Sequence, residues 1–364
     1  MSEPNDAERS IQHHGPDESR LPADTDEPDR WKPGCSIHAL QVRAAMLDAV
    51  RACFRNRGYL EVETPLLSSD IVLDAHLNPF VVDTDSGKRF LQTSPEAGMK
   101  RLLAAGCGSI FQITRSFRSG EFGIMHNPEF TMIEWYGVGT THEDQMDVTE
   151  DLVRSCLQAA RDVHGQSGTF SLNSSRFNRI RYDDAFLRHA GRRVLGSSVD
   201  QLRELAVSLG VVPPGPTSVP GEAREDVDDL LNLILAVRVE PALGAAHPEF
   251  LTHYPASQAA LARLSPDVPG TAERFELYIQ GVEVCNGYHE LTASGELQQR
   301  DSVQQKKRKE HHHPLLPGAP LMQSAMQSGL PDCAGVALGF DRLVMLALQE
   351  KSIAAVIPFP FDRA

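Results

Sequence analysis

The chain has 364 residues, and 35 basic against 49 acidic side chains give it a net charge of −14 at pH 7. At about 100–200 residues per domain, this length is sufficient for one large domain or two modest ones. No run approaches the roughly 18 consecutive apolar residues of a membrane helix, and the first residues lack a basic-then-apolar leader. We therefore exclude membrane and secreted proteins and predict a cytoplasmic protein.

The acidic charge is concentrated near the start of the sequence. Residues 1–30 contain nine acidic side chains, three arginines and four prolines, with few large aliphatic residues. Such a segment cannot bury enough apolar area to offset the entropy of ordering, so we predict a disordered acidic tail. The remaining segment, 31–364, is also acidic, which disfavours a broad nucleic-acid-binding face.

Cysteine and histidine spacing gives no metal signature. The six cysteines are scattered without a C-x-x-C pair, which favours reduced thiols over a zinc ribbon or a disulfide framework. The histidine run 311–313 follows basic residues in a polar stretch, so it predicts a solvated loop rather than a metal site.

The folded part begins with a predicted helix over 38–57. Apolar residues recur there at helical spacing, and a glycine follows the last turn. A strand-like alternation over 60–65 then closes at a proline. A second helix is expected to begin within 93–96, where a proline and a glutamate occupy the first turn.

Apolar runs at 109–117 and 130–136, joined by a glycine-containing loop, predict a long antiparallel hairpin. The segment 182–235 is helix-rich and is interrupted by a loop at 213–216. A further strand is predicted over 279–289. The small residues of 335–339 lead into a helix over 341–348. Strands grouped in hairpins with helices outside predict an α+β domain on an antiparallel sheet.

The stretch 117–136 contains the most informative chemistry. No Walker A loop, dinucleotide-binding fingerprint or nucleophile elbow occurs, so any nucleotide must be held in another way. Arg118 stands at a strand end and offers a fork of donors for phosphate. Glu134 and Tyr136 lie two apart on the returning strand and therefore share a face, where the carboxylate is suited to an ammonium group.

The C-terminal third adds a second arginine and two glutamates. Arg342 begins the last predicted helix, and Glu283 and Glu290 flank the turn-like pair 286–287. Seven residues apart on a regular strand, the two glutamates face opposite ways, so joint metal binding requires a bend or bulge between them. Each of these groups alone is better explained as a surface ion pair, but their combination favours a site.

Five segments resemble class II aminoacyl-tRNA synthetases. The strand ending at Pro65, the strand end at 117–118 and the helix entry at 339–342 resemble the three motifs of that class. The segments 126–132 and 286–291 resemble the lysyl branch. The resemblance implies the class II catalytic core, an antiparallel sheet flanked by helices, over 31–364.

Two features distinguish the chain from an ordinary lysyl-tRNA synthetase. An acidic tail, and not an anticodon-binding barrel, precedes the core, and Ala337 stands where the tRNA enzymes typically have glycine. In both features the chain resembles the truncated paralogues that ligate β-lysine onto a lysine of translation elongation factor P. The resemblance implies an AMP-forming ligase that uses ATP and Mg²⁺, modifies elongation factor P without tRNA, and forms a homodimer through 38–65. Aminoacylation of tRNA by a free-standing core and a non-catalytic regulator remain the alternatives.

The resemblance also implies roles for individual residues. The amino-acid site would comprise Ser94, Pro95, Glu96, Glu134, Tyr136, Glu290 and Ala337. The ATP site would comprise Arg118, Ser119, Gly120, Glu121, His126, Asn127, Glu283, Val284, Gly339 and Arg342. Glu283 and Glu290 would bind Mg²⁺. Arg118 and Arg342 would be catalytic, because attack of a carboxylate on the α-phosphorus builds negative charge that arginines stabilise.

One position departs from the class II pattern Arg-x-Glu. The third residue is Gly120 here, and the glutamate follows one position later as Glu121. Which residue contacts adenine therefore stays open.

Overall fold

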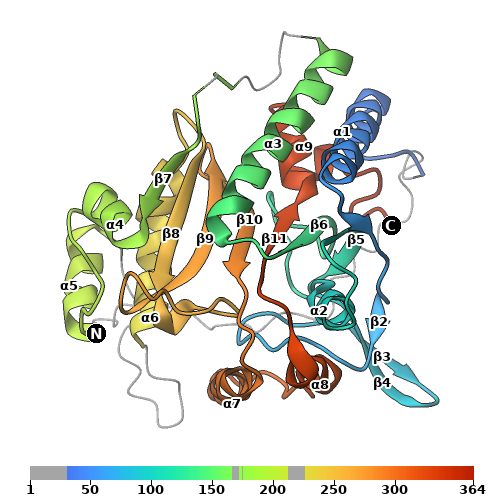
Figure 1. Cartoon of the computed structure of the whole chain (residues 1–364). Helices are drawn as coiled ribbons and strands as arrows, with labels where there is room; N and C mark the ends of the chain where they lie inside the picture. The colour runs from blue at the N-terminus through green and yellow to red at the C-terminus, as the bar shows by residue number, and fades with distance from the viewer. Residues whose placement is uncertain (1–30, 166–171, 174, 212–225) are drawn as a thin grey trace, which may run out of the picture.

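The computed structural model describes residues 31–165, 172, 173, 175–211 and 226–364, so the predicted tail at 1–30 and the loop at 213–216 lie outside the described residues. A mixed sheet of eight strands forms its centre (Figure 1). From one edge to the other the strands are β1 (Leu60–Glu61), β5 (Ile110–Phe117), β6 (Glu129–Val138), β11 (Cys333–Gly339), β10 (Val282–His289), β9 (Thr271–Ile279), β8 (Glu249–Pro255) and β7 (Asn178–Arg181).

The six central strands, in the order β5, β6, β11, β10, β9 and β8 across the sheet, pair with one another in antiparallel fashion, as predicted. The two edges differ from the prediction, because β1 pairs in parallel with β5 and β7 pairs in parallel with β8. A small second sheet has the order β2 (Leu67–Ser68), β4 (Gly87–Leu91), β3 (Val81–Thr84).

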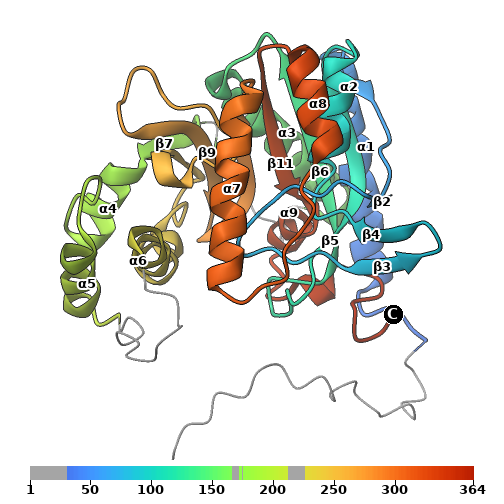
Figure 2. The same cartoon turned by 90° about the horizontal axis from the view of Figure 1, so that it is seen from below.

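Helices cover the sheet unequally on its two faces. One face packs against α1 (Ile37–Asn56), α3 (His142–His164) and α9 (Phe340–Ala347), which contact one another (Figure 1). The opposite side has α2 (Glu96–Ala104), α7 (Ser294–Glu310) and α8 (Pro320–Gly329), and Figure 2 shows α2 beside α8. Near β7 and β8 lie α4 (Tyr182–Ala190), α5 (Val199–Ser208) and α6 (Val227–Ile234).

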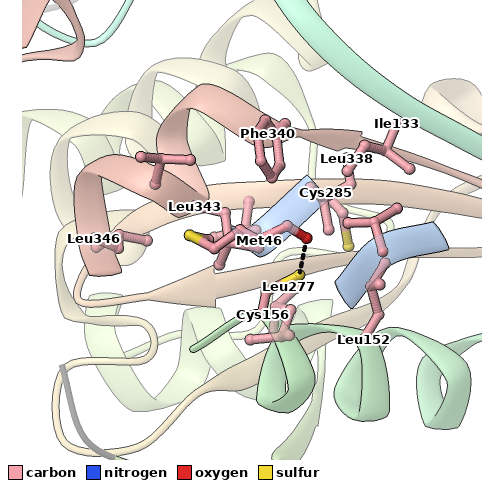
Figure 3. Close-up of a cluster of buried hydrophobic side chains, with 14 of the residues drawn as sticks. Met46, Ile133, Leu152, Cys156, Leu277, Cys285, Leu338, Phe340, Leu343 and Leu346 are labelled. Carbon is pink, nitrogen blue, oxygen red and sulfur yellow. Dashed lines mark hydrogen bonds between the residues drawn. The ribbon is translucent and has the colours of Figure 1, made fainter. Parts of the chain in front are cut away.

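The main hydrophobic core lies between the sheet and the first group of helices. Ile133 of β6 and Leu338 of β11 point into it beside Phe340, and the Cys156 thiol donates a hydrogen bond to the Met46 carbonyl oxygen at 3.8 Å (Figure 3). Successive residues of a strand point to opposite faces. The intervening residues of β6 and β11 therefore face away from this core, toward α2, α7 and α8.

Two predicted strands have different bounds in the structure. The segment 60–65 forms strand only over Leu60–Glu61, at the sheet edge. The strand predicted from 279 begins at Val282, because Gln280 and Gly281 have positive φ values of 53° and 75° and form the turn of a β9–β10 hairpin. Residue 279 is therefore the last residue of β9 and not the first of β10.

Arg43 links three elements behind the sheet. It is only 8% exposed, although a charged side chain on an amphipathic helix is expected to face the solvent. Its guanidinium lies 2.5 Å from Asp341 Oδ1, donates to Thr131 Oγ1 at 2.5 Å and stacks on the Phe340 ring. The buried charge is thus paired, and the pair fixes the start of α9 against α1 and β6.

Two smaller expectations concern histidines and cysteines. The run 311–313 follows the end of α7 as a loop, as predicted. The six cysteines are all free thiols. Of the helices in the described residues, none combines the length and the apolar character needed to cross a bilayer.

Candidate functional site

A cavity of about 770 Å³ lies on the face of the sheet opposite the main core. Strands β6, β10 and β11 contribute its floor, and α7 together with the segments 72–77, 118–127 and 256–261 contributes its walls. The volume falls within the range of small-molecule and cofactor sites. Segments far apart in the sequence thus meet around a single cavity.

Most residues predicted for the site line this cavity. They are Ser94, Glu96, Arg118, Glu121, His126, Asn127, Glu134, Tyr136, Glu283, Val284, Glu290, Ala337, Gly339 and Arg342. Pro95, Ser119 and Gly120 are not among its lining residues. Pro95 is the N-cap residue of α2, and Gly120 has φ +85°, a turn conformation that suits glycine.

Glu134 provides an unpaired acceptor at one end of the cavity. The Tyr136 hydroxyl donates to Glu134 Oε1 at 2.7 Å, whereas Glu134 Oε2 is buried and has no hydrogen-bond partner. Burial, followed by the nearby charge of Glu96, raises the pKa of Glu134 to about 8. A buried acceptor without a donor is costly, so this oxygen is suited to an incoming ammonium group.

Lys100 completes this end of the site, although the sequence analysis did not identify it. Its side chain is 1% exposed, and Nζ lies 2.6 Å from Glu96 Oε1 and 2.6 Å from Glu290 Oε2. Burial alone lowers the pKa of Lys100, but the charges of Glu290 and Glu96 outweigh burial and raise it well above the ordinary value. The available signal was the spacing of four between Glu96 and Lys100 on a predicted helix.

This end of the cavity carries excess negative charge and has little spare room. Three carboxyl groups, those of Glu96, Glu134 and Glu290, stand against the single ammonium group of Lys100, and burial raises the pKa of Glu290 to about 7 despite Lys100. At Gly335 an added Cβ would lie 2.4 Å from the Tyr136 ring and 2.7 Å from Glu290 Oε1. The pocket is therefore suited to a slender, cationic ligand.

Arg342 lies at the other end, where it joins α9 to β10 and to the loop 118–128. It donates to the Glu283 carbonyl oxygen at 2.9 Å and lies 3.2 Å from Glu283 Oε2. A further guanidinium nitrogen lies 2.8 Å from His126 Nε2. Burial and the charge of Arg342 lower the pKa of His126, so the neutral imidazole accepts a hydrogen bond from Arg342.

Arg118 is the second cation of this end and retains free donors. Its guanidinium lies over the Phe130 ring, with 5.0 Å to the ring centre, and 3.7 Å from Glu121 Oε1. Its Nε atom is buried and has no hydrogen-bond partner. Arg118 and Arg342 thus face one end of the cavity with guanidinium groups that suit phosphate oxygens.

Asn127 has a structural role that the sequence did not predict. Its side-chain amide donates to the Glu129 carbonyl oxygen at 2.5 Å and accepts from the Phe361 backbone N–H at 2.9 Å. The side chain therefore ties the loop 118–128 to the C-terminal segment, with both amide groups occupied.

Glu283 and Glu290, the two predicted metal ligands, differ in whether their carboxylates are free to bind an ion. The pairing of β9 with β10 shifts register between Glu283 and Cys285, which is the irregularity expected between the glutamates. Glu283 is partly exposed to the cavity, and burial together with the charge of Glu276 raises its pKa. Its carboxylate fits a hard cation, whereas Glu290 already pairs with Lys100. Joint binding of one ion by both glutamates stays a prediction.

Glu276 is a further residue that the sequence analysis missed. Its carboxylate accepts hydrogen bonds from the Tyr254 and Tyr278 hydroxyls at 2.5 and 2.7 Å, and from Arg274 and Asn286 at 2.7 and 3.1 Å. Arg274 and Asn286 line the cavity. The saturated carboxylate therefore holds part of the floor rigid and adds negative charge beneath Glu283.

Comparison with known proteins gives one family. The family model of class II tRNA synthetases (D, K and N) matches residues 35–363. A protein of Salmonella typhi named elongation factor P--(R)-beta-lysine ligase is 43% identical over 340 residues, which cover 92% of this chain and 98% of that protein. The protein of the same name from Salmonella arizonae is 42% identical over 340 residues, which again cover 92% of this chain and 98% of that protein. The chain therefore belongs to the class II tRNA synthetase family of the D, K and N type.

Proposed function

We propose that this protein is an ATP-dependent ligase that activates (R)-β-lysine, or lysine, and transfers it to a lysine side chain of elongation factor P. The observation that carries the proposal is that the two ends of the cavity have opposite charge. One end offers the unpaired Glu134 Oε2 among carboxylates, and the other offers the arginines Arg118 and Arg342. An amino acid with a side-chain ammonium and the phosphates of ATP fit these ends respectively, and the relatives described above bear the name of this activity.

The geometry supports two chemical steps. Glu134 and Tyr136 hold the ammonium, so that the substrate carboxylate points toward the α-phosphorus of ATP. Attack by the carboxylate oxygen forms the acyl adenylate and releases pyrophosphate, while Arg118 and Arg342 stabilise the added charge. The amine of the acceptor lysine then attacks the acyl carbon, an amide forms, and AMP leaves. Mg²⁺ held at Glu283 would supply further phosphate neutralisation.

Intact mass measurement of elongation factor P tests this function. We expect the mass to rise by one lysyl residue when the acceptor is incubated with the enzyme, ATP and (R)-β-lysine. An acceptor whose modified lysine is replaced by arginine serves as the control and is expected to stay unmodified. Charging of tRNA without any change in elongation factor P would identify a free-standing synthetase, and no ATP–pyrophosphate exchange with any amino acid would identify a regulator.

Replacement of Glu283 by glutamine tests the metal proposal. A neutral amide is a poorer ligand for a hard cation, so Glu283→Gln is expected to raise the Mg²⁺ concentration needed for half-maximal ATP–pyrophosphate exchange. The exposed Glu129, which pairs with Arg115, provides the control variant Glu129→Gln. Equal Mg²⁺ titrations for Glu283→Gln and wild type would limit Glu283 to holding Arg342.

Ala337 is positioned to influence the choice between lysine isomers. It lies opposite Glu134 on β6 and Asn286 on β10, and it lines the cavity. One methylene in a pocket is worth roughly 1–3 kcal/mol, so Ala337→Gly is expected to raise kcat/KM for α-lysine relative to β-lysine by about tenfold or more. Exchange kinetics on both isomers give the ratio.

The control for this variant is Ala334→Gly, which removes a buried methyl group of the same strand outside the cavity. It is expected to leave the isomer ratio unchanged. If Ala337→Gly lowers stability and the ratio stays at the wild-type value, Ala337 is a packing residue.

We also propose a homodimer formed through α1 and the segment 60–65. Support comes from Leu60, which is 53% exposed on the edge strand β1, and from Leu66 and Leu67 directly after the segment, which are 39% and 40% exposed. Sedimentation at micromolar concentration is expected to give the mass of two chains, and a monomer there would contradict the proposal. Because the proposed acceptor is a translation factor, we further propose a cytoplasmic location.

A further inference from the structure

Three metal-binding side chains meet outside the cavity. His142 is the first residue of α3, Glu273 lies on β9, and His289 is the last residue of β10. They are 7%, 6% and 1% exposed, and one ligand atom of each lies within 4.8 Å of the others. In the part of the chain that the structure describes, no other histidine, cysteine and carboxylate side chains form such a group.

The separations allow a shared ion, and the two ring nitrogens that face Glu273 make no hydrogen bond. Glu273 Oε2 lies 2.9 Å from His289 Nδ1 and 3.8 Å from His142 Nδ1. Both Nδ1 atoms are buried, yet neither makes a hydrogen bond of acceptable geometry. Ligands about 2.0–2.1 Å from a tetrahedral Zn²⁺ are about 3.3 Å apart, which lies between the two measured separations.

The surrounding groups prepare these atoms for coordination. His289 Nε2 lies 3.2 Å from Asp332 Oδ1, so the carboxylate orients the ring and leaves Nδ1 as the ligand. Arg263 Nε donates to Glu273 Oε2 at 2.5 Å, and the remaining lone pairs of that carboxylate stay available.

We propose that His142, Glu273 and His289 bind one divalent transition-metal ion, with Zn²⁺ and Co²⁺ preferred over Mg²⁺. Two imidazole nitrogens and one carboxylate oxygen form a donor set that suits these ions, whereas Mg²⁺ prefers oxygen ligands alone. The ion would join the start of α3 to β9 and β10. Since Glu290 directly follows His289, the ion would also fix the strand end that carries Glu290 into the amino-acid pocket. This site is separate from the Mg²⁺ proposed at Glu283.

Titration of the chelator-treated full-length protein with Co²⁺ tests this site. We expect one equivalent to bind with visible absorption, Zn²⁺ to displace it, and excess Mg²⁺ to leave it in place. The melting temperature of the protein is expected to rise with bound Zn²⁺. His142→Gln and His289→Gln are each expected to lower the affinity more than about a hundredfold, and Asp332→Asn about 10–100-fold.

The neighbouring His253 provides the matched control. Its ring lies 6.1 Å from that of His142, and its φ of 57° is well tolerated by asparagine, so His253→Asn is expected to bind like wild type. Absence of stoichiometric binding by the wild-type chain would overturn the proposal. Binding that survives both His142→Gln and His289→Gln would also overturn it, since the ion would then sit elsewhere, for instance at His311–His313.

Discussion

Arg118→Ala is expected to reduce adenylate formation by about 10²–10³-fold, equivalent to about 3–4 kcal/mol of transition-state stabilisation. Arg118 directly follows the last residue of β5 and lines the cavity, and its unpaired Nε donor supports the contact proposed with the α-phosphate. Removal of the side chain leaves the Phe130 ring and the backbone pairing of β5 in place, so the fold is expected to persist. ATP–pyrophosphate exchange with β-lysine measures the loss.

The matched control is Arg115→Ala on β5, three residues before Arg118. Arg115 is more exposed, pairs with Glu129 at 3.5 Å, and does not line the cavity. Its removal is expected to leave exchange close to wild type, because exposed ion pairs contribute little. If Arg118→Ala exchanges within about threefold of wild type, Arg118 has no part in the chemical step.

Local patterns predicted the parts of the site that depend on local geometry. Ile133 of β6 lies in the core and Glu134 lines the cavity. This placement follows from the alternation of side chains along a strand alone. The first helix and the small-residue strand before Arg342 followed from spacing in the same way. Assignment of these pieces to ATP and lysine came from the resemblance to class II synthetases, since spacing does not encode a ligand.

The residues that the sequence missed depend on distant partners. The ion pair of Arg43 with Asp341 joins α1 to α9, and an amphipathic pattern can only place such an arginine on the polar side. The cluster of His142 with Glu273 and His289 likewise forms through sheet pairing that no local rule specifies. The parallel edge strands β1 and β7 are short and lack a hairpin turn to identify their partners.

Lys100→Met is expected to lower the free energy of unfolding by about 3–5 kcal/mol at pH 8, because it leaves the buried carboxylate of Glu290 and the partly buried carboxylate of Glu96 without their cation. Urea unfolding measures the change. The control is Lys306→Met on α7, where an exposed ammonium lies 3.7 Å from Glu310 and its removal is expected to change stability by less than about 0.5 kcal/mol.

The destabilisation by Lys100→Met should also depend on pH. In the wild type the pKa of Glu290 is already raised to about 7, and loss of Lys100 raises it further. A carboxyl group whose pKa is higher in the folded state binds protons more tightly there. It therefore destabilises the fold least at acid pH, and this destabilisation grows as pH rises from the pKa of the unfolded state, about 4.3, through the pKa of the folded state. The variant should therefore recover part of its stability at pH 5.5 relative to pH 8, and Glu290→Gln added to Lys100→Met should recover part of it at pH 8. Equal losses at both pH values would show that packing of the lysine stem, and not its charge, determines the effect.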